Sequence, residues 1–294
     1  MTKEISIRKE VAKPNIRELF GLYKTSVQFK SDSTRQAYFS DVTKFVKFAE
    51  ERGQLQANPT TIQDHLESLT QGSAGRSACA IRHFFNWLVE TNNLKPQEKP
   101  TISTENITKS ELYQNISTIS DQETDQLLEQ ASSRPRDLAL FTIALKTGAK
   151  SQEILTLTKG QISKEDPQSV TISFTRDNKD KERIVQLDTK SSEIVSGYLD
   201  TLTKSGQYIF TDPKSGYDQP LSRNAIFLLL KPYRLTLGRD DLTLSTLRYT
   251  YAANLDLDNI QGFAETLGIS LINAHHLAKA LRAKPIQTPQ IPLP

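Results

Sequence analysis

The stretch RDLALFTIALKTGAKSQEILTL, residues 136–157, carries the strongest fold information in the chain. Arg136–Leu145 is apolar enough to form a buried helix. Thr147-Gly148 follows directly, and glycine is the residue that most often ends a helix. We therefore expect a buried helix that ends in a tight turn just before Lys150.

The sequence on either side of this stretch predicts a mostly helical domain with one small sheet. Upstream, Ser120-Asp121-Gln122-Glu123 forms a capping box that opens a helix. Downstream, residues 170–174 and 183–187 alternate between apolar and polar side chains across a polar turn, which predicts a β-hairpin. Further helices are expected near residues 191–202, 222–230, 247–255, 259–267 and 271–281.

The first third of the chain reads as short helices. Residues 31–34 offer N-cap side chains before an apolar stripe that runs from Tyr38 to Ala49. Asn58-Pro59-Thr60 starts a second helix, and a third reaches about Glu90. Residues 72–75, Gly-Ser-Ala-Gly, predict a turn before that third helix.

Length and composition predict about two domains. A chain of 294 residues is long for a single domain, and a polar stretch that contains Pro96 and Pro100 interrupts the periodic pattern. We expect a helical domain over residues 1–100, a linker over 101–119, a second domain over 120–283 and a proline-rich tail over 284–294.

Charge and cysteine content limit the function classes. Lys and Arg number 37 against 34 Asp and Glu, and the surplus lies in residues 1–100, where 15 basic residues face 11 acidic ones. The remainder of the chain has a net charge of −1. The single cysteine, Cys79, excludes an internal disulfide and a cysteine-cluster metal site, and it fits a reducing cytosol. The longest apolar run, residues 225–230, is far too short to span a membrane, so we expect a cytoplasmic protein.

Several motifs occur in an order that resembles the tyrosine recombinases of the phage integrase (Xer-like) family. The resemblance covers nearly the whole chain and implies an α-helical, SAM-like core-binding domain followed by a catalytic-type domain that is mainly α with a small antiparallel β-sheet. The motifs are Ser33-Thr34-x-x-x-Tyr38-x-x-Asp41, Arg82-His83-Phe84-Phe85-x-Trp87-Leu88, Thr147-Gly148-Ala149-Lys150, Lys179-Asp180-Lys181-Glu182-Arg183, Leu221-Ser222-Arg223, Leu247-Arg248 and Leu267-Gly268.

The resemblance implies a defined chemistry. In this family a tyrosine attacks a DNA phosphodiester and is joined to the 3′-phosphate, which conserves the bond energy for religation. Two arginines hold the non-bridging oxygens, a hairpin lysine protonates the leaving 5′-oxygen, and histidines assist proton transfer. Neither a metal ion nor another cofactor takes part, and we expect none here.

Most of the matching catalytic positions are altered in this chain. Lysine stands at the first arginine position and lacks the planar fork of a guanidinium. Serine and isoleucine stand at two histidine positions, the second arginine is kept, and the register leaves two lysines open for the hairpin. The positions are Lys150, Lys179 or Lys181, Ser245, Arg248 and Ile269.

The nucleophile is the most informative difference. The family places its tyrosine about ten residues after the Leu-Gly pair, but residues 269–279 contain none, and Tyr251 is the last tyrosine of the chain. We expect a pseudoenzyme. Tyr249 or Tyr251 is the alternative nucleophile of a divergent active recombinase, although both are more simply explained as core residues. His275-His276 is best explained as an exposed pair on a packed helix.

Binding of double-stranded DNA is the function that the remaining residues favour. The resemblance assigns DNA contacts to seven positions, for each of which an exposed, solvated side chain is the simpler explanation. They are Thr34, Arg35, Arg76, Arg82, Arg223, Asn224 and Lys231. We favour DNA binding for Arg76, Arg82 and Arg223, because their positions match those of the family. We expect a nucleoid-associated regulatory, accessory or architectural protein, with a homo-oligomer or protein contact through its C-terminal region. A protein-interaction module that has lost DNA binding is the alternative, because the second domain is nearly neutral.

Overall fold

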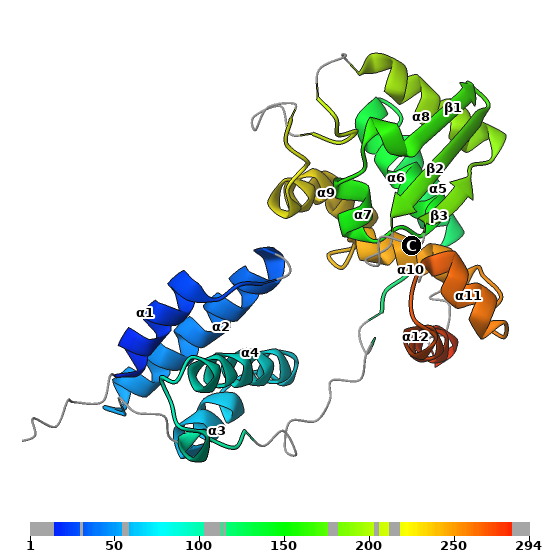
Figure 1. Ribbon diagram of the computed structural model, residues 1–294. Coiled ribbons are helices and arrows are strands. Elements are labelled where there is room, and N and C mark those ends of the chain that lie inside the picture. The colour runs from blue at the N-terminus through cyan, green and yellow to red at the C-terminus, as the bar shows by residue number, and fades with distance from the viewer. Residues whose placement is uncertain are drawn as a thin grey trace, which may run out of the picture. The chain divides into compact units, whose positions relative to one another are not determined.

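The computed structural model describes residues 15–29, 32–54, 59–102, 113, 116–175, 182–202, 206–211 and 218–283. Two compact units make up the chain, Met1–Glu111 and Leu112–Pro294, and the boundary lies inside the segment predicted to be a linker. The proline-rich tail lies outside the described residues. Figure 1 shows helices throughout the first unit and a small sheet with surrounding helices in the second.

The first unit is a helical bundle around an aromatic core. Its elements are α1 (Ile16–Ser26), α2 (Asp32–Glu51), α3 (Pro59–Glu67), α4 (Gln71–Glu90) and the short 3-10 helix η1 (Pro96–Glu98). Helix α4 packs against the other three because its apolar side chains recur with helical spacing. Tyr23 of α1, Phe45 of α2 and the neighbours Phe84 and Phe85 of α4 are fully buried in this core.

The predicted turn at residues 72–75 is wrong, because this segment is the first turn of α4. Thr70 precedes the helix in extended backbone, and the helix continues unbroken through Gly72 and Gly75. Each glycine costs roughly 1 kcal/mol in a helix interior. The burial of Ala78 and Ile81 in the core offsets that cost, which the local sequence does not reveal.

The sheet of the second unit is antiparallel with the order β1-β2-β3. Its strands are β1 (Ile162–Asp166), β2 (Ser169–Thr175) and β3 (Glu182–Gln186), so the predicted hairpin is present as β2 and β3. Register pairs Thr171 with Gln186 and Thr175 with Glu182. The alternating apolar residues of β2 face the core, where α8 covers them, and β1 adds a mostly exposed edge strand that the sequence did not predict.

Helices form the rest of the second unit. They are α5 (Asp121–Ala131), α6 (Pro135–Thr147), α7 (Ser151–Leu155), η2 (Lys159–Gln161), α8 (Thr189–Thr201), α9 (Arg223–Leu237), α10 (Leu244–Ala253), α11 (Ile260–Leu267) and α12 (Leu271–Ala283). Helix α6 is the central one, packed against α8 on one side and α10 on the other. The fold class is therefore confirmed: mainly α, with a small antiparallel sheet in the second unit.

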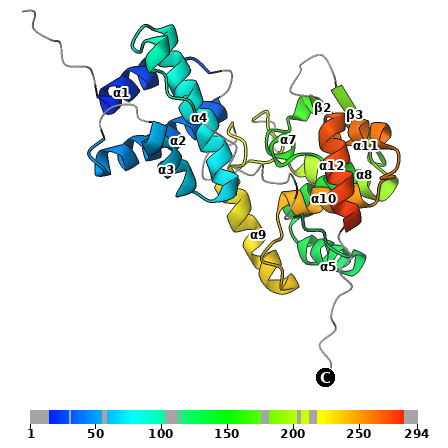
Figure 2. The ribbon, with the colours of Figure 1, turned by 90° about the horizontal axis from the view of Figure 1, so that it is seen from below.

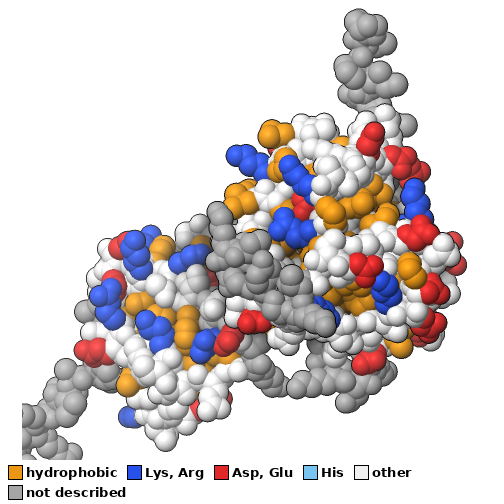
Figure 3. Space-filling model, turned by 90° about the horizontal axis from the view of Figure 1, so that it is seen from above, with side chains coloured by type: hydrophobic (Ala, Val, Ile, Leu, Met, Phe, Trp, Pro, Cys, Tyr) orange, Lys and Arg blue, Asp and Glu red, His pale blue; other side chains and the backbone are white. Residues whose placement is uncertain are grey.

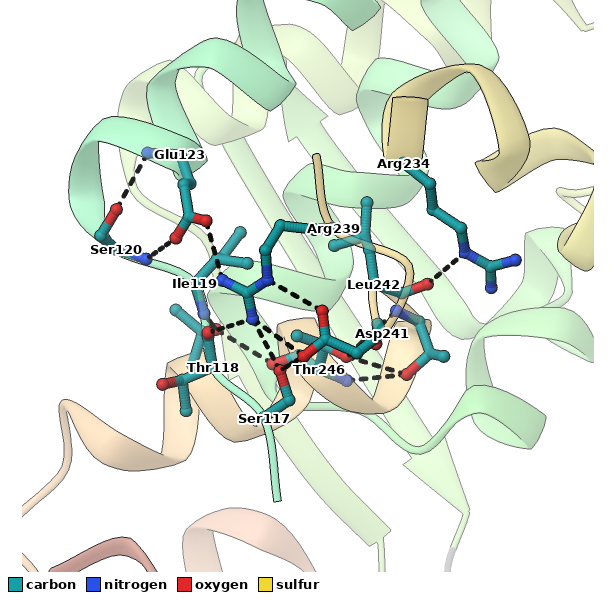
Figure 4. Close-up of polar contacts among 12 residues, drawn as sticks. Ser117, Thr118, Ile119, Ser120, Glu123, Arg234, Arg239, Asp241, Leu242 and Thr246 are labelled. Carbon is teal, nitrogen blue, oxygen red and sulfur yellow. Dashed lines mark hydrogen bonds and ion pairs between the residues drawn. The ribbon is translucent and has the colours of Figure 1, made fainter. Parts of the chain in front are cut away.

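Arg239, in the loop between α9 and α10, joins its own loop to residues 117–123, which are distant in sequence (Figure 4). Its Nη1 donates to a Glu123 oxygen on α5 at 2.7 Å, and its Nε donates to Asp241 at 2.8 Å. Nη2 donates to the Ser117 hydroxyl at 2.8 Å and to the Thr118 carbonyl at 2.9 Å. The guanidinium thus binds the entry segment, residues 116–119, to the loop that leads into α10.

The same entry segment runs along α10 and fixes its position. The Ile119 amide donates to the Thr250 hydroxyl at 3.0 Å, and Ile116 is buried in a cluster shared with α10, α11 and α12. At the start of α10, the Thr246 hydroxyl donates to the Asp241 carbonyl at 2.8 Å. Residues 116–119 are therefore packed into the second unit, although their polar surroundings in the sequence suggested a linker.

Candidate functional site

Four of the sequence-predicted catalytic positions line one cavity of the second unit. Its volume is about 490 Å³, and it lies where the start of α7, the helix α10 and the loop between α11 and α12 meet. Lys150 enters from the turn before α7, Ser245 and Arg248 from α10, and Ile269 from the α11–α12 loop. The remaining lining residues are Tyr113, Ser151, Tyr249, Gly268, Ser270, Asn273 and Leu277.

Arg248 supplies the buried positive charge of this cavity. Its side chain is only 8% exposed, and burial lowers the pKa of its guanidinium, which nevertheless stays charged at any physiological pH. Nη1 donates to the Gly148 carbonyl, and Nη2 donates to the Leu267 carbonyl at 3.1 Å. These two carbonyls lie at the C-terminal ends of α6 and α11, where unpaired carbonyl groups carry partial negative charge.

Arg183 of β3 makes a second bridge between the same two helix ends. Its Nη1 donates to the Thr147 carbonyl at 2.7 Å and to the Thr266 carbonyl at 3.2 Å. Nη2 contacts a Glu153 oxygen at 3.3 Å, and the guanidinium carbon lies 4.5 Å from the centre of the Phe174 ring. Two buried arginines, one of which lines the cavity, therefore hold the C-terminal ends of α6 and α11 together.

The turn that places Lys150 depends on a glycine. Gly148 ends α6 with φ of +56°, and a Cβ at this position would overlap the ring of Tyr251. Glu153 fixes the start of the next helix, α7, because its carboxylate accepts a hydrogen bond from the Lys150 amide at 2.7 Å. The sequence Thr-Gly-x-Lys therefore places a lysine at the cavity because the backbone can turn sharply only where the side chain is absent.

Two tyrosines lie in the cavity, and neither comes from α12. Tyr249 packs edge-to-face against Tyr113 with 6.2 Å between ring centres, and burial raises the pKa of both hydroxyls. Tyr251, the other alternative nucleophile, packs against the Gly148 turn instead of lining the cavity. His275 and His276 of α12 are exposed and do not line it.

The sequence-predicted DNA contacts of the first unit lie on α2 and α4, and the structure gives some of them other partners. Arg76 holds the buried Asp41 carboxylate with two hydrogen bonds, Nε at 2.6 Å and Nη2 at 3.1 Å. Arg35 pairs with Asp32 one turn earlier on α2 at 3.0 Å. Thr34 is exposed and Arg82 is half-buried.

The predicted contacts of the second unit lie on α9, outside the cavity. Arg223, Asn224 and Lys231 are all exposed on this helix. Lys179 and Lys181, the two possible hairpin lysines, lie outside the described residues.

Sequence reasoning missed part of the cavity. Ser270 and Asn273 surround the predicted positions, and no motif pointed to them. Tyr113 stands in a polar, aperiodic stretch that gave no structural signal. The hairpin motif includes Arg183 without predicting a role for it. Its place on the apolar face of the strand was the signal that it is buried and paired.

Two family models match the chain. The phage integrase family matches residues 117–261, and the phage integrase N-terminal SAM-like domain matches residues 26–92. The chain belongs to the phage integrase family. Both family matches fall within the units that the structure separates.

Similar proteins of this family extend over almost the same length. Tyrosine recombinase XerC of Herpetosiphon aurantiacus is 26% identical over 278 residues, which is 87% of each chain. Tyrosine recombinase XerC of Roseiflexus castenholzii is 23% identical over 286 residues, covering 88% of this chain and 86% of the relative.

Solved structures share the fold. XerH site-specific recombinase bound to palindromic difH substrate, a post-cleavage complex, matches at 17% identity with a TM-score of 0.66, covering 89% of this chain and 90% of the other. A lambda integrase dimer bound to a COC′ core site matches at 15% identity with a TM-score of 0.66, covering 94% and 99%.

The described residues contain neither a membrane-spanning helix nor a cluster of metal-ligating side chains. None of the helices there has the length and apolar character needed to cross a membrane. Within the same part of the chain, His, Cys, Asp and Glu side chains form no group of three or more that could hold a metal ion.

Proposed function

We propose that this chain is a member of the phage integrase family that binds double-stranded DNA without cutting it. The observation that carries the proposal is the composition of the cavity. Lys150 and Arg248 supply positive charge, while Ser245 and Ile269 stand where the family resemblance places histidines, and no tyrosine follows Tyr251 in the sequence.

Loss of the nucleophile weighs more than the other changes. Removing a general acid or base usually slows a reaction by ~10²- to 10⁴-fold, which leaves measurable catalysis. Removing the group that forms the covalent intermediate abolishes that route altogether. Helix α12 lies where the resemblance expects the nucleophile, and it contributes Asn273 and Leu277 to the cavity.

The groups that remain suit a phosphate that is bound and not cleaved. A guanidinium has five N–H donors, and Arg248 uses Nη1 and Nη2 for one carbonyl each, so N–H groups remain for a phosphate oxygen. Lys150 adds a second cation to the lining of the cavity. Relatives whose structures are complexes with DNA support a duplex as the ligand. The role that follows is regulatory, accessory or architectural.

DNA binding is tested by selecting genomic fragments that the full chain retains, followed by fluorescence anisotropy across a salt series. Each phosphate that a protein neutralises adds about 0.9 to the slope of log affinity against log salt. Lys150→Ala should lower that slope by about one phosphate, whereas Lys190→Ala, an exposed lysine on α8, should leave it unchanged. Absence of affinity at low salt would contradict DNA binding and favour a module that contacts protein.

Absence of cleavage needs a separate test. A nicked suicide duplex traps any covalent protein–DNA adduct, which denaturing electrophoresis detects as a shifted band. We expect no adduct, and a trapped adduct would overturn the proposal of inactivity.

One observation favours the alternative of a divergent active recombinase: Tyr249 lines the cavity beside Arg248. If an adduct forms, Tyr249→Phe and Tyr113→Phe identify the tyrosine that carries it. The raised pKa of both hydroxyls, caused by burial, argues against either one as an activated nucleophile.

A further inference from the structure

Helix α9 exposes large apolar side chains to solvent. Phe227 is 58% exposed, Leu228 65% and Leu235 73%, in a chain where most large apolar residues are buried. Figures 1 and 2 both show α9 at the margin of the second unit, on the side away from the sheet. An exposed apolar row on an amphipathic helix indicates a surface that contacts another molecule.

The charges around this row point to an anionic partner. Among residues 223–237 the charged side chains are Arg223, Lys231 and Arg234, and the segment contains no Asp or Glu. Figure 3 shows apolar and basic side chains next to one another on the surface of the second unit. Asn224, Leu228 and Lys231 lie three or four residues apart, so they share one face of the helix.

The neighbouring face of α9, which carries Arg223 and Phe227, adjoins the cavity that Arg248 lines. A second cavity of about 430 Å³ lies between α7, α9 and α10, and its lining includes Arg223 and Phe227. Ser151 and Ser245 line both cavities. A ligand whose phosphate lies in the first cavity therefore has its neighbouring groups beside α9.

The dimensions of α9 suit the major groove of a DNA duplex. Its 15 residues span roughly 22 Å at 1.5 Å per residue, and the major groove of a duplex is wide enough to admit one helix. The prominent apolar group displayed in that groove is the C5-methyl group of thymine. An asparagine can bind adenine there through two hydrogen bonds.

We propose that α9 reads A·T base pairs in the major groove, with Leu228 on the thymine methyl group and Asn224 on the adenine of the same or an adjacent pair. This inference rests on the proposed DNA binding and names its sequence preference. Lys231, one turn beyond Leu228, contributes a phosphate contact on the same face, and the Phe227 ring, held 4.6 Å from the Arg234 guanidinium, forms the side of the apolar row.

Uracil scanning tests this proposal without altering the protein. A duplex selected by the chain from a random-sequence library is resynthesised with deoxyuridine in place of each thymine, which removes only the methyl group. Loss of one contacted methyl should weaken binding about fourfold, the equivalent of one buried CH₂ group. The effect should be confined to the thymines under α9.

A matched pair of variants locates the effect. Leu228→Ala removes an exposed side chain and should abolish the difference between thymine and uracil duplexes. Leu22→Ala removes an exposed leucine of α1 in the first unit and should keep the full difference. Thermal melting checks that both variants fold as the parent chain does.

The possible results separate the two proposals. Binding that is unaffected by uracil at every position would overturn the reading of thymine while leaving DNA binding intact. A uracil effect that persists in Leu228→Ala would overturn the assignment to α9. Failure to bind any duplex at low salt would overturn the proposed function and this inference together.

Discussion

Replacing Arg239 by methionine should destabilise the second unit by about 3 kcal/mol. The side chain is 15% exposed and donates hydrogen bonds to Glu123, Asp241, Ser117 and Thr118. Hydrogen bonds to charged groups contribute about 1.5–3 kcal/mol each, but both carboxylates reach solvent and can be rehydrated when the arginine is lost. The expected cost therefore falls at the lower end of the range for breaking a buried ion pair.

The chain contains an internal control for this measurement. Its single tryptophan, Trp87, lies on α4, so tryptophan fluorescence follows the first unit, whereas far-UV circular dichroism follows both. With an m-value of roughly 2 kcal/mol per molar urea, Arg239→Met should shift the second unit's midpoint by about 1.5 M. The fluorescence transition should not move. A shift below 0.5 M, on the order of 1 kcal/mol, or equal shifts of both transitions, would refute the role given to Arg239.

The same residue gives a pH signature. Hydrogen bonding to Arg239 lowers the pKa of Asp241 from 3.8 to about 2. Because the folded carboxylate takes up its proton at lower pH than the unfolded one, its stabilising contribution is complete above pH 4 and is lost as the pH falls towards 2. Urea midpoints measured at pH 5 and pH 3 should differ less in Arg239→Met than in the parent chain.

Three further substitutions test the contacts that shape the two units. Gly148→Ala should cost the second unit roughly 2–4 kcal/mol by circular dichroism, because alanine is strained at φ of +56° and its Cβ overlaps Tyr251; a neutral result would contradict the account of the turn. Asp41→Asn should lower the first unit's stability by about 1–2 kcal/mol in the fluorescence transition, since the Arg76 ion pair is lost, and a change in the second unit alone would be inconsistent with it. Arg183→Met should destabilise the second unit by about 3 kcal/mol, and a cost under 1 kcal/mol, seen in the same urea titration, would show that the bridge between α6 and α11 is unimportant.

Local signals predicted the parts of the fold that local chemistry determines. The capping box at Ser120 is present with the Glu123 amide bound to the serine hydroxyl at 3.2 Å, and Gly148 ends α6 in the left-handed conformation. The hairpin followed from the alternation in β2. These elements need no distant contact to be recognised.

Other elements depend on contacts that the sequence does not display. Helix α9 continues through Pro232, where a break is expected, because burial of Ile226, Leu230 and Tyr233 outweighs the roughly 3 kcal/mol that an interior proline costs. Strand β1 is polar and mostly exposed, so its pairing with β2 left no apolar alternation to detect.

The candidate site also has residues that the sequence predicts and residues that only the folded structure reveals. The order of the motifs matched the family pattern, and this match identified four positions that line one cavity: Lys150, Ser245, Arg248 and Ile269. Tyr113 was missed because its place in the cavity comes from the path of the entry segment along α10.

The structural role of Arg248 limits which residues a member of this family can lose when it stops cutting DNA. Arg248, to which the family resemblance assigns a phosphate contact, also bridges the C-terminal ends of α6 and α11, as Arg183 does. A lineage that stops cutting DNA is released from keeping a tyrosine or a histidine, because neither holds the backbone together in this way. It is not released from keeping this arginine, since losing it would leave buried carbonyl groups unpaired. An intact arginine in such a sequence is therefore evidence of a folded domain, and only the nucleophile is evidence of an active one.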